Sequence, residues 1–121
     1  MKKTYHLCLS GGNEVMFRHD KDYIYANNCL CLAAYKTGST ILAYSIMSNH
    51  VHICVRTEDP YAFMKAFRYP YTRYFNQKYG RKGQLGDKHF FLCEIEGLYH
   101  LLAVLSYILR NPLHHGVAAT P

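Results

Sequence analysis

The chain carries four residues that could do chemistry together, namely His50, His52, Tyr107 and Asn111. Residues 48–55 are predicted to form a strand, and because side chains alternate along a strand, both imidazoles lie on one face. Tyr107 and Asn111 stand one turn apart in a predicted helix and therefore lie on one side of it. Two imidazoles and an amide oxygen could hold a divalent metal ion, Mg²⁺ or Mn²⁺, beside the tyrosine hydroxyl. This set suggests nucleophilic attack on a phosphodiester.

Each of these signals is weak when taken alone. A lone His-x-His is more often a pair of half-exposed strand histidines than a metal site. Tyr107 is one of 12 tyrosines, and tyrosines usually pack rather than attack. Asn111 precedes Pro112 and could simply end a helix. The hypothesis rests on these weak signals occurring together. One side of the predicted helix carries His100, Val104, Tyr107 and Asn111.

The stretch from Tyr61 to Lys82 combines cations with aromatic rings and has no acidic residue. Cations can contact phosphates, and aromatic faces can stack on unpaired bases. We expect most of the aromatic side chains to belong to the core, which makes the basic side chains the better candidates for contact with DNA. The predicted DNA-binding residues are Arg56, Lys65, Arg68, Arg73, Lys78, Arg81 and Lys82.

The elements that must position these residues are strands and helices in mixed order. We expect strands near residues 4–9, 41–47, 48–55 and 89–96, and helices near 20–35, 60–79 and 97–111. Ser48 and Asn49 form a tight turn, so the two strands beside them should pair as a hairpin. Pro70 predicts a kink in the second helix or its division into two pieces. The third helix should end at Asn111, since a residue before proline avoids helical geometry.

Apolar residues predict which side of each helix is buried. The first helix should bury the side that carries Ile24, Cys31, Leu32 and Tyr35. In the last helix, the predicted apolar stripe consists of Leu101, Leu105, Ile108 and Leu109.

The order of the elements indicates an α+β fold with a ferredoxin-like antiparallel sheet (β-α-β-β-α-β) and a further C-terminal helix that carries the tyrosine. Both early helices would cover one face of the sheet and meet Val51, Ile53 and Val55. The face with His50 and His52 would lie opposite, where the last helix could cross it.

Composition restricts the class of protein. The 121 residues suggest a single domain, 1–121, and the net charge of +6 favours polyanionic partners without requiring one. Five cysteines without a Cys-x-x-Cys pair predict reduced, buried thiols in the cytoplasm, with a structural zinc site as a distant alternative. There is no signal-peptide pattern, and no stretch approaches the roughly 20 apolar residues of a membrane span, so we expect no membrane partner.

Several motifs resemble those of the HUH single-tyrosine transposases of bacterial insertion sequences, most closely the REP-associated tyrosine transposase branch. Residues 43–52 look like the motif around the histidine pair, and residues 107–113 look like the tyrosine motif. Residues 74–76 with Gly83 are similar to the central segment, and the resemblance covers residues 5–117. Ser48 departs from the proline common in the branch, Pro70 interrupts a helix that is usually continuous, and residues 85–87 differ before the fourth strand.

The resemblance implies that Tyr107 attacks a phosphate of single-stranded DNA near a hairpin. The products would be a 5′-phosphotyrosine link and a free 3′-hydroxyl, with the divalent ion held by His50, His52 and Asn111. Insertion-sequence relatives suggest a homodimer with exchanged helices, whereas the REP-associated branch suggests a monomer. A replication-initiator or mobilisation nickase, and a DNA-hairpin-binding protein without catalysis, are the alternative interpretations.

Overall fold

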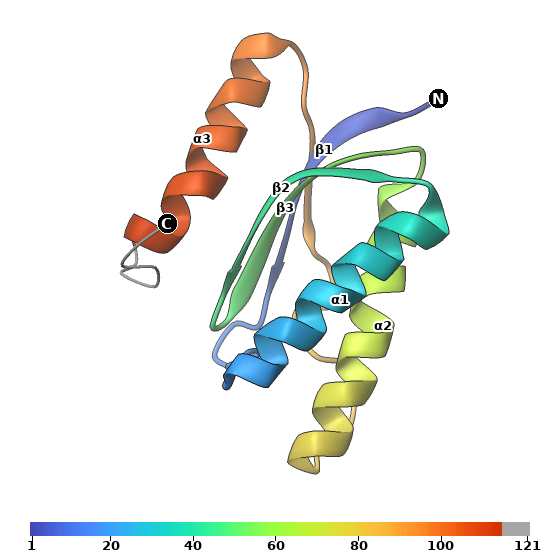
Figure 1. Cartoon of the computed structure of the whole chain (residues 1–121), viewed down its shortest axis with the longest axis vertical. Helices are drawn as coiled ribbons and strands as arrows, with labels where there is room; N and C mark the ends of the chain where they lie inside the picture. Colours follow the sequence, from blue (N-terminus) through green and yellow to red (C-terminus); the bar gives the residue numbers. More distant parts are fainter. Residues whose placement is uncertain (115–121) are drawn as a thin grey trace.

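The computed structural model describes the backbone of residues 1–114 and the side chains of residues 1–110. Its elements follow one another as β1 (Lys3–Ser10), α1 (Asp20–Thr37), β2 (Thr40–Met47), β3 (His50–Thr57), α2 (Pro60–Tyr79), β4 (Phe91–Glu94) and α3 (Leu98–His114). Figure 1 shows α1 and α2 side by side on one face of the sheet and α3 on the other face. The predicted α+β arrangement is therefore confirmed.

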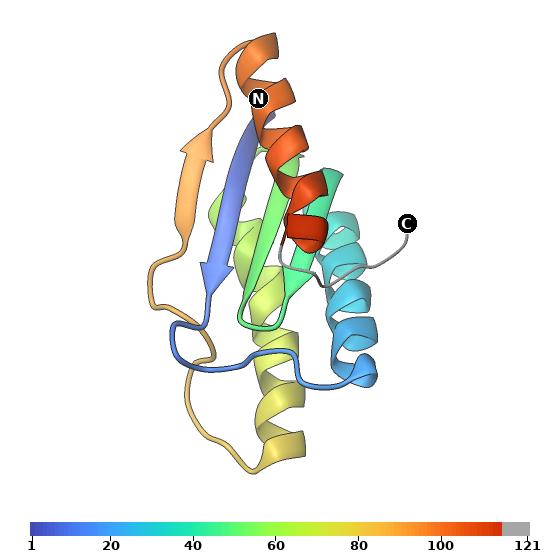
Figure 2. The ribbon, with the colours of Figure 1, turned by 90° about the vertical axis from the view of Figure 1, so that its left-hand side faces the viewer.

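The four strands form one antiparallel sheet in the order β2-β3-β1-β4. The turn at Ser48 and Asn49 joins β2 to β3 as the predicted hairpin, while β1 lies between β3 and β4. In Figure 2 the strands lie next to one another and α3 runs across β3 and β2. This order places the histidine strand in the interior of the sheet, where a strand on each side fixes its register.

The alternation of side chains along β3 separates a packing face from a face open to chemistry. Val51, Ile53 and Val55 are fully buried and belong to the main core, which α1 and α2 cover. Cys54 points the other way and packs with Val104 and Ile108 of α3 in a second, smaller cluster. Both outcomes match the prediction that the two faces of this strand have different roles.

The buried side of α1 differs from the prediction. Ile24 is 61% exposed and Tyr35 is 85% exposed, and Cys31 and Leu32 are also exposed. The buried side is formed instead by smaller residues at helical spacing, namely Ala26, Cys29, Leu30 and Ala33. Small side chains let α1 approach α2 closely, so the largest apolar residues were a misleading guide to the packed face.

Pro70 does not divide the second helix, because α2 runs without interruption from Pro60 to Tyr79. Proline removes one backbone hydrogen bond, but Phe67 and Tyr71 on either side of it are buried in the core. Core packing on both sides of the proline keeps the two halves in one helix. The prediction of two pieces was wrong.

Two predicted boundaries also change. The fourth strand is shorter than expected, because only Phe91–Glu94 pairs with β1. The last helix does not stop at Asn111 but continues through Pro112 to His114. Within α3, Ile108 is buried and Leu101 and Leu105 are partly buried, as predicted. Val104 also lies on the buried side, whereas Leu109, predicted to be in the stripe, is 65% exposed.

Two further predictions concern the cysteines and membrane-spanning segments. All five cysteines are unpaired, but Cys31 is exposed, so only part of the expectation of buried thiols holds. Within the described residues, no helix combines the length and the apolar character that crossing a membrane requires.

Asp22 joins the start of α1 to the end of α2 and is fully buried. Its carboxylate accepts hydrogen bonds from the hydroxyls of Tyr74 and Tyr79, each at 2.6 Å, and pairs with the Lys78 ammonium group at 2.9 Å. Burial raises the pKa of Asp22, but the hydrogen bonds from these three side chains outweigh burial and hold the pKa well below its ordinary value. The charged carboxylate therefore stabilises the contact between the two helices.

We expect Asp22→Asn to lower the free energy of unfolding at neutral pH by about 1–3 kcal/mol, because the variant weakens several buried hydrogen bonds. Since folding lowers the pKa, this contribution is present above the ordinary aspartate pKa of about 4 and is lost as the pH falls below it. Urea unfolding of wild type and variant between about pH 7 and pH 3 measures the effect. Asp20→Asn, at an exposed position in the same turn, is the control; an equal loss there would contradict this role for Asp22.

Candidate active site

The histidine pair lies on the face of the sheet that α3 crosses. In the register of β3, His50 stands opposite Ser10 and His52 stands opposite Cys8. The two rings are 5.1 Å apart between centroids and nearly perpendicular, at 85°. His52 is buried, with 7% of its surface exposed, whereas His50 is half-buried. The strand thus presents two imidazoles at different depths of one surface.

Tyr107 lies against His52 within the same chain. Its ring centroid is 5.2 Å from that of His52, with an interplanar angle of 87°. The side chain is 47% exposed, so solvent and a large substrate can reach it. Val104 and Ile108, on the neighbouring side of α3, are buried against Cys54 and hold the helix in this position. Residues more than 50 positions apart in the chain are thereby brought together.

His6 is a further member of the cluster that the sequence pattern did not predict. Its Nε2 atom lies 3.2 Å from Nδ1 of His52, and its ring centroid is 6.3 Å from that of Tyr107. Burial, and then the neighbouring His100, lower the pKa of His6, which favours the neutral imidazole. The signal that could have found it is the alternation along β1, since His6 shares a face with Cys8, and Cys8 stands opposite His52 in the register of β1 and β3.

Cys8 completes the immediate surroundings of His52. Its sulfur lies 3.8 Å from Nε2 of His52. Burial, and then the charge of Asp87, raise the pKa of the Cys8 thiol to about 11. In the metal-free protein, this shift favours the thiol over the thiolate at neutral pH.

The imidazole pair has the chemistry to supply two nitrogen ligands to a divalent cation. Among the residues whose side chains are described, no group of three or more His, Cys, Asp or Glu could hold a metal ion. The backbone of Asn111 continues α3 one turn after Tyr107, but its side chain lies outside the described residues. The pair supplies two nitrogens without a carboxylate, so phosphate or water oxygens would have to complete the shell.

A protein-family model described as "Transposase IS200 like" matches residues 1–111 of the chain. The chain belongs to this transposase family. The match spans both the histidine strand and the tyrosine helix, and it confirms the resemblance to insertion-sequence transposases. Membership implies the cutting and joining of DNA. No curated protein matches the chain significantly.

Solved structures share the fold of this transposase. One is a REP-associated tyrosine transposase bound to a REP hairpin, with a TM-score of 0.71 and 15% identity over 97% of this chain and 69% of that chain. Another is a protein of Deinococcus radiodurans R1 whose description assigns it as a transposase, with a TM-score of 0.63 and 18% identity over 92% of this chain and 91% of that chain. At these identities, the likeness establishes the fold alone.

The basic residues predicted to bind DNA fall into two groups in the transposase structure. Arg56, Lys65, Arg73 and Lys82 are exposed and available to phosphates. Lys78 forms an ion pair with the buried carboxylate of Asp22, so its ammonium group is less available to bind a phosphate. Arg81 pairs with Glu14 and also donates to Asn76, Gly83 and Gln84.

Arg68 does not fit the predicted contact with DNA, because only 7% of it is exposed. One of its terminal nitrogens, Nη2, donates to the backbone carbonyls of Leu85 and Asp87, each at 2.8 Å. Arg68 thus anchors the loop between α2 and β4 to the helix. The amino-acid sequence shows a cation in a basic stretch but not the side of the helix on which it lies.

The aromatic rings of α2 follow the predicted division. Phe63, Phe67, Tyr71 and Phe75 are buried, whereas Tyr69 is 58% exposed.

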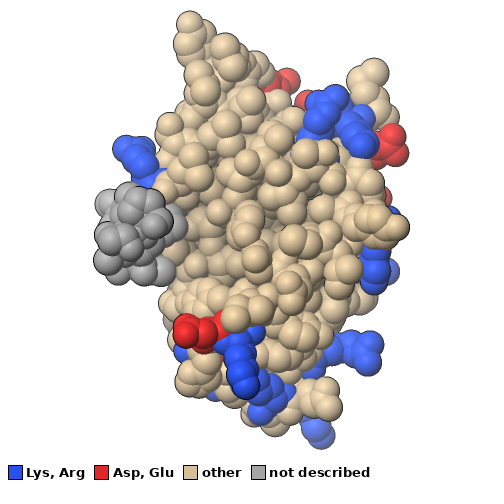
Figure 3. Space-filling model, viewed as in Figure 1, with Lys and Arg blue, Asp and Glu red and all other residues tan. Residues whose placement is uncertain are grey.

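In the view of Figure 3 the Lys and Arg side chains lie around the rim, above all at the lower end, and the centre is largely uncharged. On this face, phosphates would therefore meet cations at the rim rather than at the centre.

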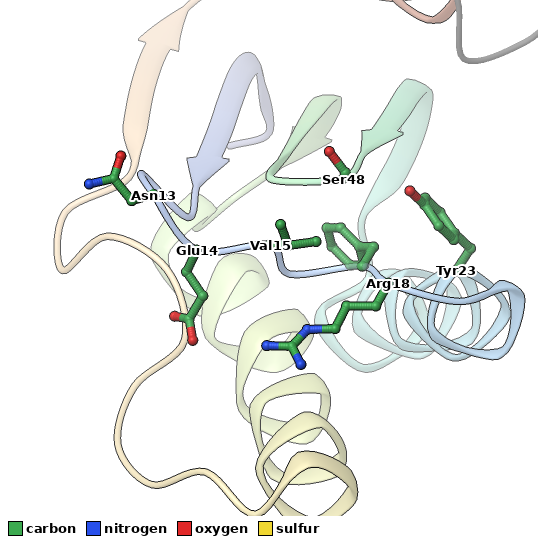
Figure 4. Close-up of a pocket in the computed structure, with 7 residues that line it drawn as sticks. Asn13, Glu14, Val15, Arg18, Tyr23 and Ser48 are labelled. Carbon is green, nitrogen blue, oxygen red and sulfur yellow. The ribbon is translucent and has the colours of Figure 1, made fainter.

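An open hollow of about 820 Å³ lies beside the turn that precedes the histidine strand, and Figure 4 shows the side chains of Glu14 and Arg18 extending away from Ser48. The Arg18 guanidinium stacks over the rings of Tyr79 and Phe75, at 4.4 Å and 5.1 Å from their centroids. The lining is contributed by Asn13, Glu14, Val15, Phe17, Arg18, Tyr23 and Ser48. The histidine pair and Tyr107 do not line this hollow.

We expect Arg68→Met to lower the free energy of unfolding by about 1–3 kcal/mol, because two loop carbonyls lose their donor. Thermal unfolding monitored by circular dichroism provides the measurement. Arg73→Met removes an exposed cation from the same helix and should leave the melting temperature nearly unchanged. Equal melting temperatures for the two variants would show that Arg68 is not a structural anchor.

Proposed function

We propose that this transposase cleaves and rejoins single-stranded DNA beside a hairpin, through a covalent 5′-phosphotyrosine intermediate on Tyr107. The observation that carries the proposal is the ring contact between Tyr107 and His52 within one chain. A half-exposed tyrosine beside the His52 ring could reach a phosphate bound there, which supports the proposal. Its family membership supplies the reaction class of cutting and joining DNA.

In the proposed step, the Tyr107 oxygen attacks the phosphorus atom and forms a new oxygen–phosphorus bond. The bond from phosphorus to the 3′ oxygen breaks, the phenol loses its proton, and the 3′ oxygen leaves as a hydroxyl. A later 3′-hydroxyl reverses the exchange, so the energy of the phosphodiester bond is kept and no ATP is needed. We propose that Tyr107 serves the histidines of its own subunit.

His50 and His52 are the proposed ligands of a divalent ion, Mg²⁺ or Mn²⁺, with Asn111 as the third protein ligand. A bound ion would supply positive charge that polarises the scissile phosphate. Neutral imidazole is required for ligation, because a protonated ring has no nitrogen lone pair to share with the ion. The rings and a water or phosphate shell would then replace the carboxylates found in many nucleases.

Contact with the DNA is assigned to the exposed cations Arg56, Lys65, Arg73 and Lys82, with Tyr69 as an exposed ring that could stack on a base. A hairpin is the proposed substrate because the REP-associated transposase with the same fold was solved with a REP hairpin bound. A protein that binds the hairpin without cutting it is the alternative, and the next experiment distinguishes the two.

We expect wild type to form a denaturant-resistant adduct with single-stranded hairpin DNA in the presence of Mn²⁺, and Tyr107→Phe to form none, because the phenol oxygen is the proposed nucleophile. The DNA is a pool of hairpins with randomised single-stranded flanks, labelled at the 3′ end. A 5′-phosphotyrosine retains the 3′ label on the protein, whereas a 5′ label leaves with the free 3′-hydroxyl fragment.

Tyr99→Phe is the matched control, because Tyr99 lies on the same helix and is 87% exposed. This variant should form the adduct as wild type does. An adduct that persists in Tyr107→Phe would exclude Tyr107 as the nucleophile. Binding of the hairpin by wild type without any adduct would favour the non-catalytic alternative.

We expect His50→Ala to weaken the binding of Mn²⁺ by at least about tenfold, because one of two imidazole ligands is lost. Isothermal titration calorimetry of the DNA-free protein measures this affinity directly. His89→Ala, which changes an exposed histidine outside the cluster, should bind as wild type does. Equal affinity in wild type and His50→Ala would remove His50 from the metal site.

A further inference from the structure

We infer that Asn49 is a positioning residue that fixes the tautomer of His50 and thereby directs Nε2 of His50 to the metal ion. The inference deepens the proposed function and rests on it, because His50 is there a metal ligand. Asn49 lies in the tight turn between β2 and β3, one residue before the histidine. Its role is read from two hydrogen bonds made by its carboxamide.

The first hydrogen bond sets the orientation of the carboxamide. Nδ2 of Asn49 donates to the backbone carbonyl of Gly12 at 3.3 Å. A carbonyl oxygen can only accept, so the amide nitrogen of Asn49 must face Gly12. The opposite orientation would place two oxygens against each other, and the Asn49 oxygen Oδ1 is therefore directed to the other side.

The second hydrogen bond sets the proton on the imidazole. Oδ1 of Asn49 lies 2.9 Å from Nδ1 of His50. Because an amide oxygen also only accepts, Nδ1 must carry the proton in this contact. A neutral imidazole has a single ring proton, so the lone pair that can bind a metal ion then lies on Nε2. Neighbouring groups commonly select the ligating nitrogen of a histidine in this way.

The turn that carries Asn49 is itself held by the loop between β1 and α1. The backbone N–H of Gly11 donates to the Asn49 carbonyl at 2.7 Å, and those of Met16 and Phe17 donate to the Ser48 carbonyl at 2.8 and 3.0 Å. Met16 and Phe17 are buried, which anchors this loop in the core. A Cβ atom at Gly11 would lie 2.4 Å from the Glu14 carbonyl oxygen, so the close loop requires glycine there. The carboxamide thus rests on a fixed support.

Two substitutions separate the hydrogen bond from the shape of the side chain. Asn49→Leu keeps a similar volume but removes the acceptor, so His50 can exchange between its two tautomers. Asn49→Asp loses the donor to Gly12 but keeps an oxygen acceptor beside Nδ1, which is the group that sets the tautomer, so it should preserve the Nδ1–H form. Thermal unfolding of both variants checks that the fold is retained.

The test uses long-range ¹H–¹⁵N correlation spectra of the histidine rings, recorded on the metal-free full chain at about pH 8, where imidazole is neutral. Wild type and Asn49→Asp should show His50 with its proton on Nδ1. Asn49→Leu should show a shift towards the Nε2–H form. Calorimetry with Mn²⁺ should show affinity roughly 10- to 100-fold weaker in Asn49→Leu, and no weaker than wild type in Asn49→Asp, because the carboxylate keeps the acceptor and adds negative charge.

The outcomes distinguish this inference from the proposed function. An Nε2–H tautomer of His50 in wild type would overturn the inference, even if Asn49→Leu failed to fold. The Nδ1–H form unchanged in Asn49→Leu would also overturn it, while leaving Mn²⁺ binding by wild type intact. If wild type shows the Nδ1–H form but binds no Mn²⁺, the metal-dependent function fails and the role of Asn49 in fixing the tautomer stands.

Discussion

The packing of α3 against the sheet is the contact on which the arrangement of the site depends. Val104 and Ile108 are buried against Cys54, and this small cluster is separate from the main core. Burying two branched apolar side chains contributes roughly 1.5–3 kcal/mol each, which is comparable to a substantial part of a small domain's net stability. Tyr107 contacts His52 because it lies next to these anchors on the helix. The position of the tyrosine is thus a consequence of apolar packing.

The two faces of β3 have different roles, one in the core and one in the site. One face of β3 is occupied by Val51, Ile53 and Val55 in the main core, and the other presents His50 and His52. Pairing with β1 and β2 fixes the register, and a slip of one residue would exchange the two faces. Polar groups around the histidines then come from neighbouring segments, with His6 beside His52 and Asn49 beside His50. The same strand therefore contributes one set of side chains to the core and another set to the site.

Charge in this transposase has both structural and surface roles. The net charge of +6 is consistent with a nucleic-acid partner, but Arg68 holds a loop and Arg81 pairs with Glu14. Lys78 belongs to the network around Asp22 that joins α1 to α2. Most of the other cations, such as Arg73, are exposed. Burial and partners decide which positive charges can meet a phosphate.

The sequence by itself determined the fold class, the hairpin at Ser48 and Asn49, and the common face of His50 and His52, because these follow from local periodicity and turn chemistry. Only the tertiary structure decided the buried side of α1, the continuity of α2 through Pro70, the burial of Arg68 and the place of His6. Each of these depends on which surfaces meet across long separations in the chain. Packing between distant segments can override local preference, and periodicity along one segment does not record it.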